Sequence, residues 1–152
     1  MTRSASPWLK PGVSRAIWMT ALQALLGFAG WTLLLVIAVF LYRGMRFLGG
    51  TPINHWPRAA KPGDDAPMVR RIEDAHANCL ENLPIFAVVV LAAAALGRLE
   101  AVNVLAPYVL YARIGQTSAH LSGTGQFHVL VRATFWAAQL VLFVWMIVAL
   151  ST

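Results

Sequence analysis

The sequence predicts an all-α integral membrane protein built as a single four-helix bundle, and three observations support this fold class. First, 59% of the 152 residues are hydrophobic and only 12% are charged, about half the charged share of an average soluble domain. Second, the apolar residues form runs that are long enough to span a membrane as helices. Third, basic residues flank these runs, as they do beside membrane spans.

The first span is expected over residues 17–42, with Trp18 and Tyr42 as interfacial aromatic residues near its ends. Residues 1–16 are then an N-terminal tail, and residues 17–150 form the membrane domain. The run is too long for the core of a cleavable signal, so we expect it to stay in the protein.

A polar loop rich in glycine and proline follows, over residues 43–71. Pro67 is expected in the first turn of the second helix, with Asp64 or Asp65 as its cap. The remaining helices are predicted over about residues 68–96, 102–121 and 127–150, with Gly97 and Arg98 ending the second helix and a tight turn over 122–126.

The basic residues predict the orientation of the bundle. Eight of the twelve lie on the side of the 43–71 loop and four on the opposite side. The positive-inside rule therefore places this loop in the cytoplasm and both termini on the other side. The net charge of +6 is scattered beside apolar runs, which favours membrane anchoring over nucleic-acid binding.

The cysteine and histidine content limits which disulfides and metal sites the protein can form. The single cysteine, Cys79, excludes an internal disulfide and a multi-cysteine metal site. The four histidines show no metal-ligand spacing, so we expect no metal. Cys79 fits a small buried side chain better than a nucleophile.

Polar residues recur at helical spacing on three of the predicted helices, where residues three, four and seven apart share a face. Because these helices alternate in direction, the three polar faces lie in the same half of the bilayer. The residues are Arg71, Asp74, Asn78, Glu81 and Asn82 on the second helix, Arg113, Gln116, Thr117 and His120 on the third, and His128, Arg132 and Gln139 on the fourth.

Charged side chains inside a membrane face one another or water rather than lipid. The sequence therefore predicts a polar pocket that opens to the cytoplasm and fits a zwitterionic ligand. Arginines suit its carboxylates, Glu81 or Asp74 its ammonium, and Asn78 or Gln116 its amides. The alternative is structural: Gln116, Thr117 and Gln139 joining helices, and Arg71 pairing with Asp74.

The segments "RRIEDAHANCLENLPIFAVVVLAAAAL", "YARIGQTSAHLSG" and "LVRATFWAAQ" resemble the MAPEG family, the membrane-associated proteins in eicosanoid and glutathione metabolism. The resemblance covers about residues 17–150. It implies a left-handed bundle assembled as a homotrimer, with glutathione bound between subunits on the cytoplasmic side. A hydrophobic small molecule or lipid is then the second substrate.

The resemblance also implies roles for single residues. Asn78 and Glu81 match glutathione-contacting residues, His76 matches a histidine of one member, and Arg113 matches the arginine of the third helix. Arg132 matches the arginine that stabilises the thiolate, with Arg113 as the alternative. Arg71, Asp74, Gln116 and His120 complete the expected binding site.

Three departures from the family pattern bear on activity. Asp74 stands where members often have an arginine, His120 where they have a tyrosine, and Arg132 lies about three residues later than the catalytic arginine. The sequence therefore leaves two functions open: a glutathione-dependent transferase or peroxidase, and a non-catalytic lipid-binding or scaffold protein. A transporter is disfavoured, because no inverted repeat is visible.

Overall fold

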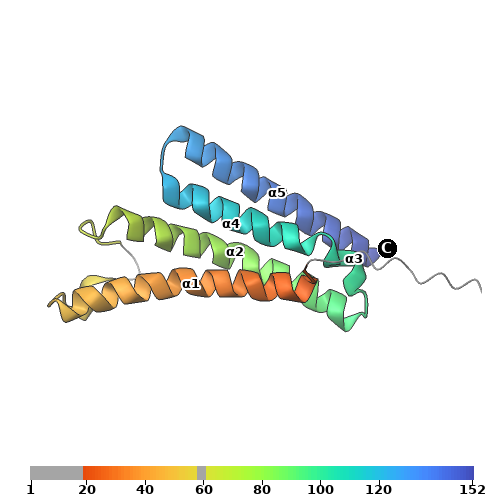
Figure 1. Cartoon of the computed structure of the whole chain (residues 1–152), viewed down its shortest axis with the longest axis horizontal. Coiled ribbons are helices and arrows are strands. Elements are labelled where there is room, and N and C mark those ends of the chain that lie inside the picture. The colour runs from red at the N-terminus through yellow and green to blue at the C-terminus, as the bar shows by residue number, and fades with distance from the viewer. Residues whose placement is uncertain (1–18, 58–60) are drawn as a thin grey trace, which may run out of the picture.

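The computed structural model describes residues 19–57 and 61–152. The tail 1–16, the start of the predicted first span at Ile17 and Trp18, and the loop residue Ala59 lie outside the described residues. The described chain is helical, with α1 (Ala21–Leu48), α2 (Pro67–Ala95), α3 (Leu99–Asn103), α4 (Ala106–Ser122), α5 (Gln126–Ser151) and a short 3-10 turn, η1 (Ile53–His55) (Figure 1).

Helix α1 differs from the predicted first span at both ends. It begins at Ala21 because Thr20 forms a capping box: its hydroxyl accepts from the Gln23 backbone N–H at 3.2 Å, and the Gln23 amide oxygen accepts from the Thr20 N–H at 2.9 Å. It continues past Tyr42 to Leu48, because Arg43 and Arg46 pair with acidic residues that fold against this turn.

Helix α2 begins at Pro67, in the first turn as predicted, but the predicted acidic cap is wrong. Ala66 is the capping residue and its side chain makes no capping bond. The buried Asp65 carboxylate instead accepts from Arg46 at 2.7 Å and from the Trp56 indole at 3.1 Å. Arg46 of α1 thus binds the Asp65 carboxylate, which the sequence predicted as a cap for the backbone of α2.

Gly97 ends α2 in the left-handed region, with φ of +66°. The Gly97 N–H donates to Ala94 at 3.1 Å and the Arg98 N–H to Ala93 at 2.8 Å, the paired bonds of a Schellman motif. This confirms the predicted end of the second helix.

The predicted third span is divided into α3 and α4. Pro107 stands in the first turn of α4, where its missing N–H is tolerated, so the helix restarts there. With 17 residues, α4 is roughly 26 Å long, slightly less than the hydrocarbon thickness of about 30 Å. α3 adds length to this crossing, and its Asn103 accepts from the Ala21 N–H at 2.8 Å, which ties α3 to the start of α1.

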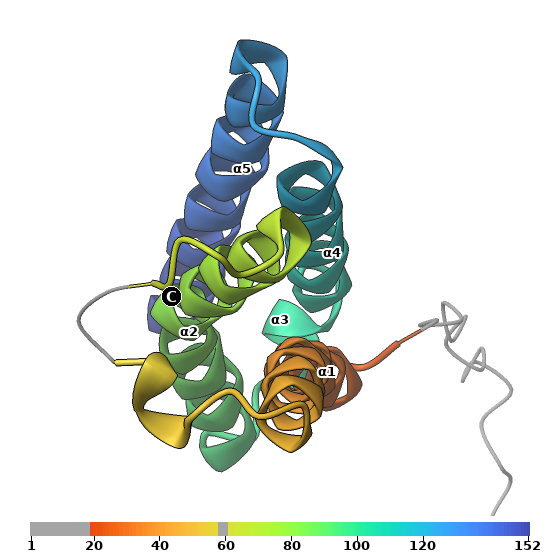
Figure 2. The same ribbon diagram turned by 90° about the vertical axis from the view of Figure 1, so that its left-hand side faces the viewer.

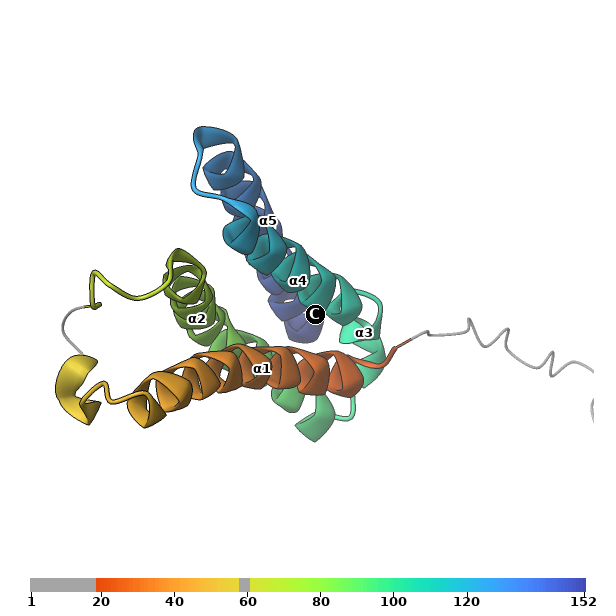
Figure 3. The same ribbon diagram turned by 60° about the vertical axis from the view of Figure 1, so that its left-hand side comes forward.

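In the described part of the chain, α1, α2 and α5 are long and apolar enough to cross a membrane. Together with α4 they form the predicted all-α membrane bundle. α1 contacts α2 and α4, and α2 contacts α4 and α5; Figure 2 shows α5 farthest from α1. The helices converge near α3 and the C-terminus and diverge toward the α4–α5 turn (Figure 3).

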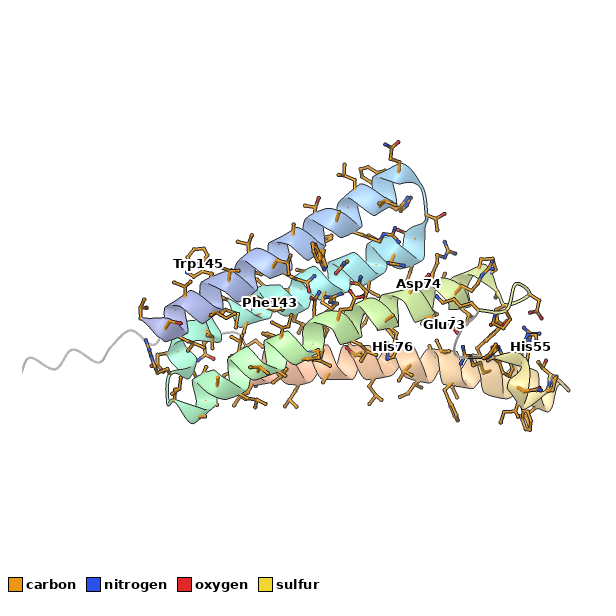
Figure 4. The ribbon with its side chains drawn as sticks, turned by 180° about the vertical axis from the view of Figure 1, so that it is seen from behind. His55, Glu73, Asp74, His76, Phe143 and Trp145 are labelled. Carbon is orange, nitrogen blue, oxygen red and sulfur yellow. The ribbon has the colours of Figure 1, made fainter. Side chains whose placement is uncertain are left out.

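Aromatic side chains fill the converging half of the bundle. Phe86 packs between Phe28, at a ring-centroid distance of 5.9 Å, and Phe143, at 6.1 Å. Figure 4 shows Phe143 directed between the helices and Trp145 directed away from them. Trp145 keeps 61% of its surface exposed, as suits a side chain that faces lipid. The diverging half carries the polar groove described below.

Candidate functional site

A groove of about 420 Å³ opens where α2, α4 and α5 diverge. Its walls combine polar side chains from all three helices with apolar residues of α5. The lining residues are Asn78 and Glu81 of α2, Gln116 and His120 of α4, and Val129, Arg132, Ala133 and Trp136 of α5. Five residues from the predicted polar faces therefore meet in one place.

Arg113 lies behind the groove, sealed inside the subunit with 1% of its surface exposed. Its Nη1 donates to Asn78 Oδ1 at 2.7 Å, and its guanidinium lies 5.1 Å from the centre of the Phe28 ring. Its Nε and Nη2 have no hydrogen-bond partner among the described residues. The cation is therefore held by one neutral amide and one aromatic face.

The groove has charges of both signs without internal neutralisation. The ion pairs of the described residues involve neither Glu81, Arg113 nor Arg132. Glu81 is exposed and Arg132 is half-buried. An anion on α2 and a cation on α5 that line one groove can therefore each meet a ligand group of opposite sign.

Two hydrogen bonds join the helices around the site. Gln139 Nε2 donates to Gln116 Oε1 at 2.9 Å, and Trp31 Nε1 donates to Thr117 Oγ1 at 3.2 Å. Both are contacts of the helix-joining kind. Gln116 takes part in this packing and also lines the groove, so its two predicted roles coexist.

Besides Arg113, three predicted site residues do not line the groove. Asp74 bonds to Lys61 of the loop, and not to Arg71 as the structural alternative had it. Arg71 is half-buried, with its Nε lacking a partner among the described residues. His76 lies three residues after Glu73, which bonds to Arg43 of α1 at 2.5 Å, and Figure 4 shows His76 on this α1 side of α2.

Sequence reasoning did not name the apolar residues of the groove or the residue that supports Arg113. Trp136 follows Arg132 by four residues, and that spacing is a signal that the two share a face. Phe28 carried no such signal, because its contact with Arg113 joins residues that are distant in the sequence.

The loop before α2 is held by a separate polar network outside the groove. Arg46 donates to Asp64 and to Asp65, each at 2.7 Å. The hydrogen bond from Arg46 holds the pKa of the Asp64 carboxyl below its usual value. In the same network, the side-chain atoms of His55, Asp64 and Asp65 that could bind a metal ion lie within 4.8 Å of one another. Arg46 and Trp56 already donate hydrogen bonds to the two carboxylates.

A family model for the MAPEG family matches residues 17–152. The chain belongs to the MAPEG family. No curated protein and no solved structure matches it. MAPEG proteins include glutathione transferases and peroxidases as well as non-catalytic members, so membership leaves the activity of this MAPEG protein to be argued from its groove.

Proposed function

We propose that this MAPEG protein is a glutathione-dependent transferase or peroxidase that acts on a hydrophobic electrophile. One observation supports this most directly: Arg132 lies in a groove beside Asn78 and Glu81, and no ion pair with a described residue neutralises it. A half-buried arginine without an anionic partner suits an anionic ligand group.

The groove offers complementary groups for each part of glutathione. Glu81 suits the ammonium, while Asn78 and Gln116 suit the peptide amides. Arg132 suits the thiolate, and the walls formed by Val129 and Trp136 suit an apolar second substrate. A volume of about 420 Å³ falls within the range of small-molecule sites, about 300–1,000 Å³.

The proposed chemistry depends on the charge of Arg132. A free thiol has a pKa near 8.5, and a neighbouring cation lowers that value; each unit corresponds to about 1.36 kcal/mol. The apolar residues in the groove wall strengthen this interaction, since they lower the local dielectric constant. Arg113, the alternative thiolate partner, is sealed behind Asn78, which favours Arg132.

The competing function is a non-catalytic lipid-binding protein. A second groove of about 550 Å³ between α2 and α5 favours it, because its lining is almost wholly apolar and suits an acyl chain. This groove lies toward the converging end of the bundle, near Ser151, and contains no ionisable side chain. It would serve lipid binding without thiol chemistry.

Calorimetric titration of the detergent-purified protein with glutathione tests the proposal. We expect saturable binding, an ultraviolet thiolate signal, and turnover of a model electrophile. Arg132→Leu should reduce thiolate formation and turnover by about ten- to a thousand-fold. This is about the range seen when an enzyme loses one donor that stabilises its transition state. The fold should persist, since no described ion pair is lost. Arg70→Leu is the charge-matched control outside the groove.

Two results would contradict the proposal. Wild-type protein that binds no glutathione removes the transferase and peroxidase functions together. An unchanged thiolate signal in Arg132→Leu, with a collapsed thermal melt, assigns Arg132 to the structure and not to the chemistry. Binding of lipid alone, unaffected by Arg132→Leu, is the outcome that the competing function requires.

We also propose that the active form is a homotrimer. The groove is open on one side and Glu81 is exposed in the single chain, so a neighbouring subunit can close it. The number three comes from the family resemblance alone. Native mass spectrometry in mild detergent should show three chains, and monomer as the sole species would exclude this assembly.

A further inference from the structure

We propose that His120 is the proton carrier of the groove, accepting the proton of the bound thiol and returning it to the product. This inference rests on the proposed thiol chemistry and adds a catalytic residue to it. The inference rests on the position of His120. Among the described residues, His120 is the histidine that lines the groove, and it does so from α4, beside Arg132 of α5.

The other histidines are placed elsewhere. The His55 ring bonds to Asp64 in the loop at 3.0 Å, and His76 lies on the α1 side of α2 (Figure 4). The His128 ring packs on Gly123, where an added Cβ would lie 2.7 Å from it. Of the four histidines, His120 alone lines the groove together with Arg132.

The charges around His120 fit a group that gains and loses a proton. Asp74 of α2 favours the imidazolium, as does the place of His120 in the last turn of α4, where helix carbonyls carry partial negative charge. Burial opposes the imidazolium, and so do Arg132 of α5 and Lys61 of the loop. His128 is the remaining titratable group of the adjoining turn. Charges of both signs therefore lie near His120, and imidazole is the side chain that ordinarily gains and loses a proton near neutral pH.

His120 and Arg132 have different roles in this proposal. Proton transfer from a thiol to an imidazole is unfavourable even in water, where the ordinary pKa values are about 8.5 and 6.5. Arg132 offsets this by stabilising the thiolate, as paired cations do for catalytic cysteines. His120 supplies the site for the proton, and Arg132 supplies the opposite charge.

The proposed step balances for an epoxide electrophile. The sulfur–hydrogen bond of the thiol breaks and the proton moves to the free ring nitrogen of His120. The thiolate sulfur attacks carbon, a carbon–sulfur bond forms, and the carbon–oxygen bond of the epoxide breaks. The alkoxide then takes the proton from the imidazolium, which yields an alcohol and restores neutral His120. With an aryl chloride, chloride leaves and the proton passes to water.

This difference between electrophiles makes the inference testable. We expect kcat/KM of the wild type, measured with glutathione, to fall at acid pH as a single group takes up a proton. His120→Gln should lose this pH dependence. Its turnover should fall about a hundredfold or more with an aryl epoxide, and less with an aryl chloride. His128→Gln is the matched control and should retain the wild-type profile.

Chemical rescue separates proton transfer from a structural role. His120→Ala leaves space in an open groove, and added imidazole should restore epoxide turnover in this variant but not in Arg132→Leu. Wild-type turnover with an unchanged pH profile in His120→Gln, or no rescue of His120→Ala, overturns the role of His120 and leaves the proposed function standing. A wild type without glutathione turnover overturns both.

Discussion

At the scale of single residues, the notable feature is the difference between two arginines with similar sequence surroundings. Arg113 keeps 1% of its surface exposed and bonds to Asn78, whereas Arg132 is half-buried and lines the groove. A buried cation is tolerated only when polar groups replace its water. Asn78 and the Phe28 ring provide this for Arg113, so Asn78 supports the fold as well as the groove.

Replacement of Asn78 by leucine should therefore destabilise the subunit. The change removes a hydrogen bond to a charged donor, and we expect a loss of about 1.5–3 kcal/mol in the free energy of unfolding. Denaturation in mixed micelles, followed by circular dichroism, measures it. The double variant Asn78→Leu, Arg113→Met should recover part of the loss, because no buried charge then lacks a partner. Equal stability of wild type and single variant would refute this role.

At the scale of elements, small residues set how closely the helices approach. Gly115 of α4 faces the Phe135 ring of α5, and a Cβ added at Gly115 would lie 2.7 Å from a ring atom. Gly30 on α1 has nothing within 4 Å of such a Cβ. Gly115 is thus needed for close packing, and Gly30 is not.

Gly115→Ala should separate α4 from α5 and cost about 1–3 kcal/mol of unfolding free energy, as overpacked cores do. Gly30→Ala is the control, and should be neutral or stabilising by up to about 1 kcal/mol because alanine favours helix. Thermal melts of both variants in the same detergent compare them. If Gly115→Ala melts no lower than Gly30→Ala, the contact with Phe135 does not limit helix approach.

The loop before α2 is expected to loosen in acid. Because the Arg46 hydrogen bond lowers the pKa of Asp64, its stabilisation is present above the ordinary carboxyl pKa of about 4 and is lost as pH falls through the lowered value. Hydrogen exchange over residues 49–57 should therefore accelerate below about pH 4. Asp64→Asn should show rapid exchange already at neutral pH. Exchange in this variant that stays slow at neutral pH would exclude the Arg46–Asp64 contact as the anchor.

At the scale of the whole molecule, the bundle has a polar, diverging end and an apolar, converging end. Figure 1 shows the loop before α2 and the α4–α5 turn at the diverging end, and the C-terminus at the other. The groove opens near the first of these ends. Membrane sidedness therefore decides from which compartment a polar ligand enters.

We expect the diverging end to face the cytoplasm, because it carries most of the basic residues. Cysteines introduced singly at Gly63 and Ser151, in a Cys79→Ala background, report this. Gly63 is an exposed loop position and Ser151 an exposed helix end. An impermeant thiol reagent added to intact cells should label Ser151→Cys and spare Gly63→Cys. The reverse pattern would invert the topology.

The sequence by itself determined the fold class and the grouping of the polar residues. Hydropathy marked the helices, and three- and four-residue spacing put Asn78 and Glu81 on one face of α2. Chain direction then put the polar parts of α2, α4 and α5 in the same half of the bilayer. These are local properties of the chain, because helix periodicity and membrane thickness fix them without knowledge of neighbours.

Only the tertiary structure decided which polar residues line the groove and which support it. Arg113 and Arg132 both interrupt apolar helices, yet α1 brings Phe28 against Arg113, and Arg132 remains at the groove. In the same way, Lys61 of the loop bonds to Asp74 of α2, and Asp65 of the loop accepts from Arg46 of α1. Such partners are far apart in the sequence, and a charged side chain takes whichever partner the packing brings near, because desolvation makes an unpaired charge costly.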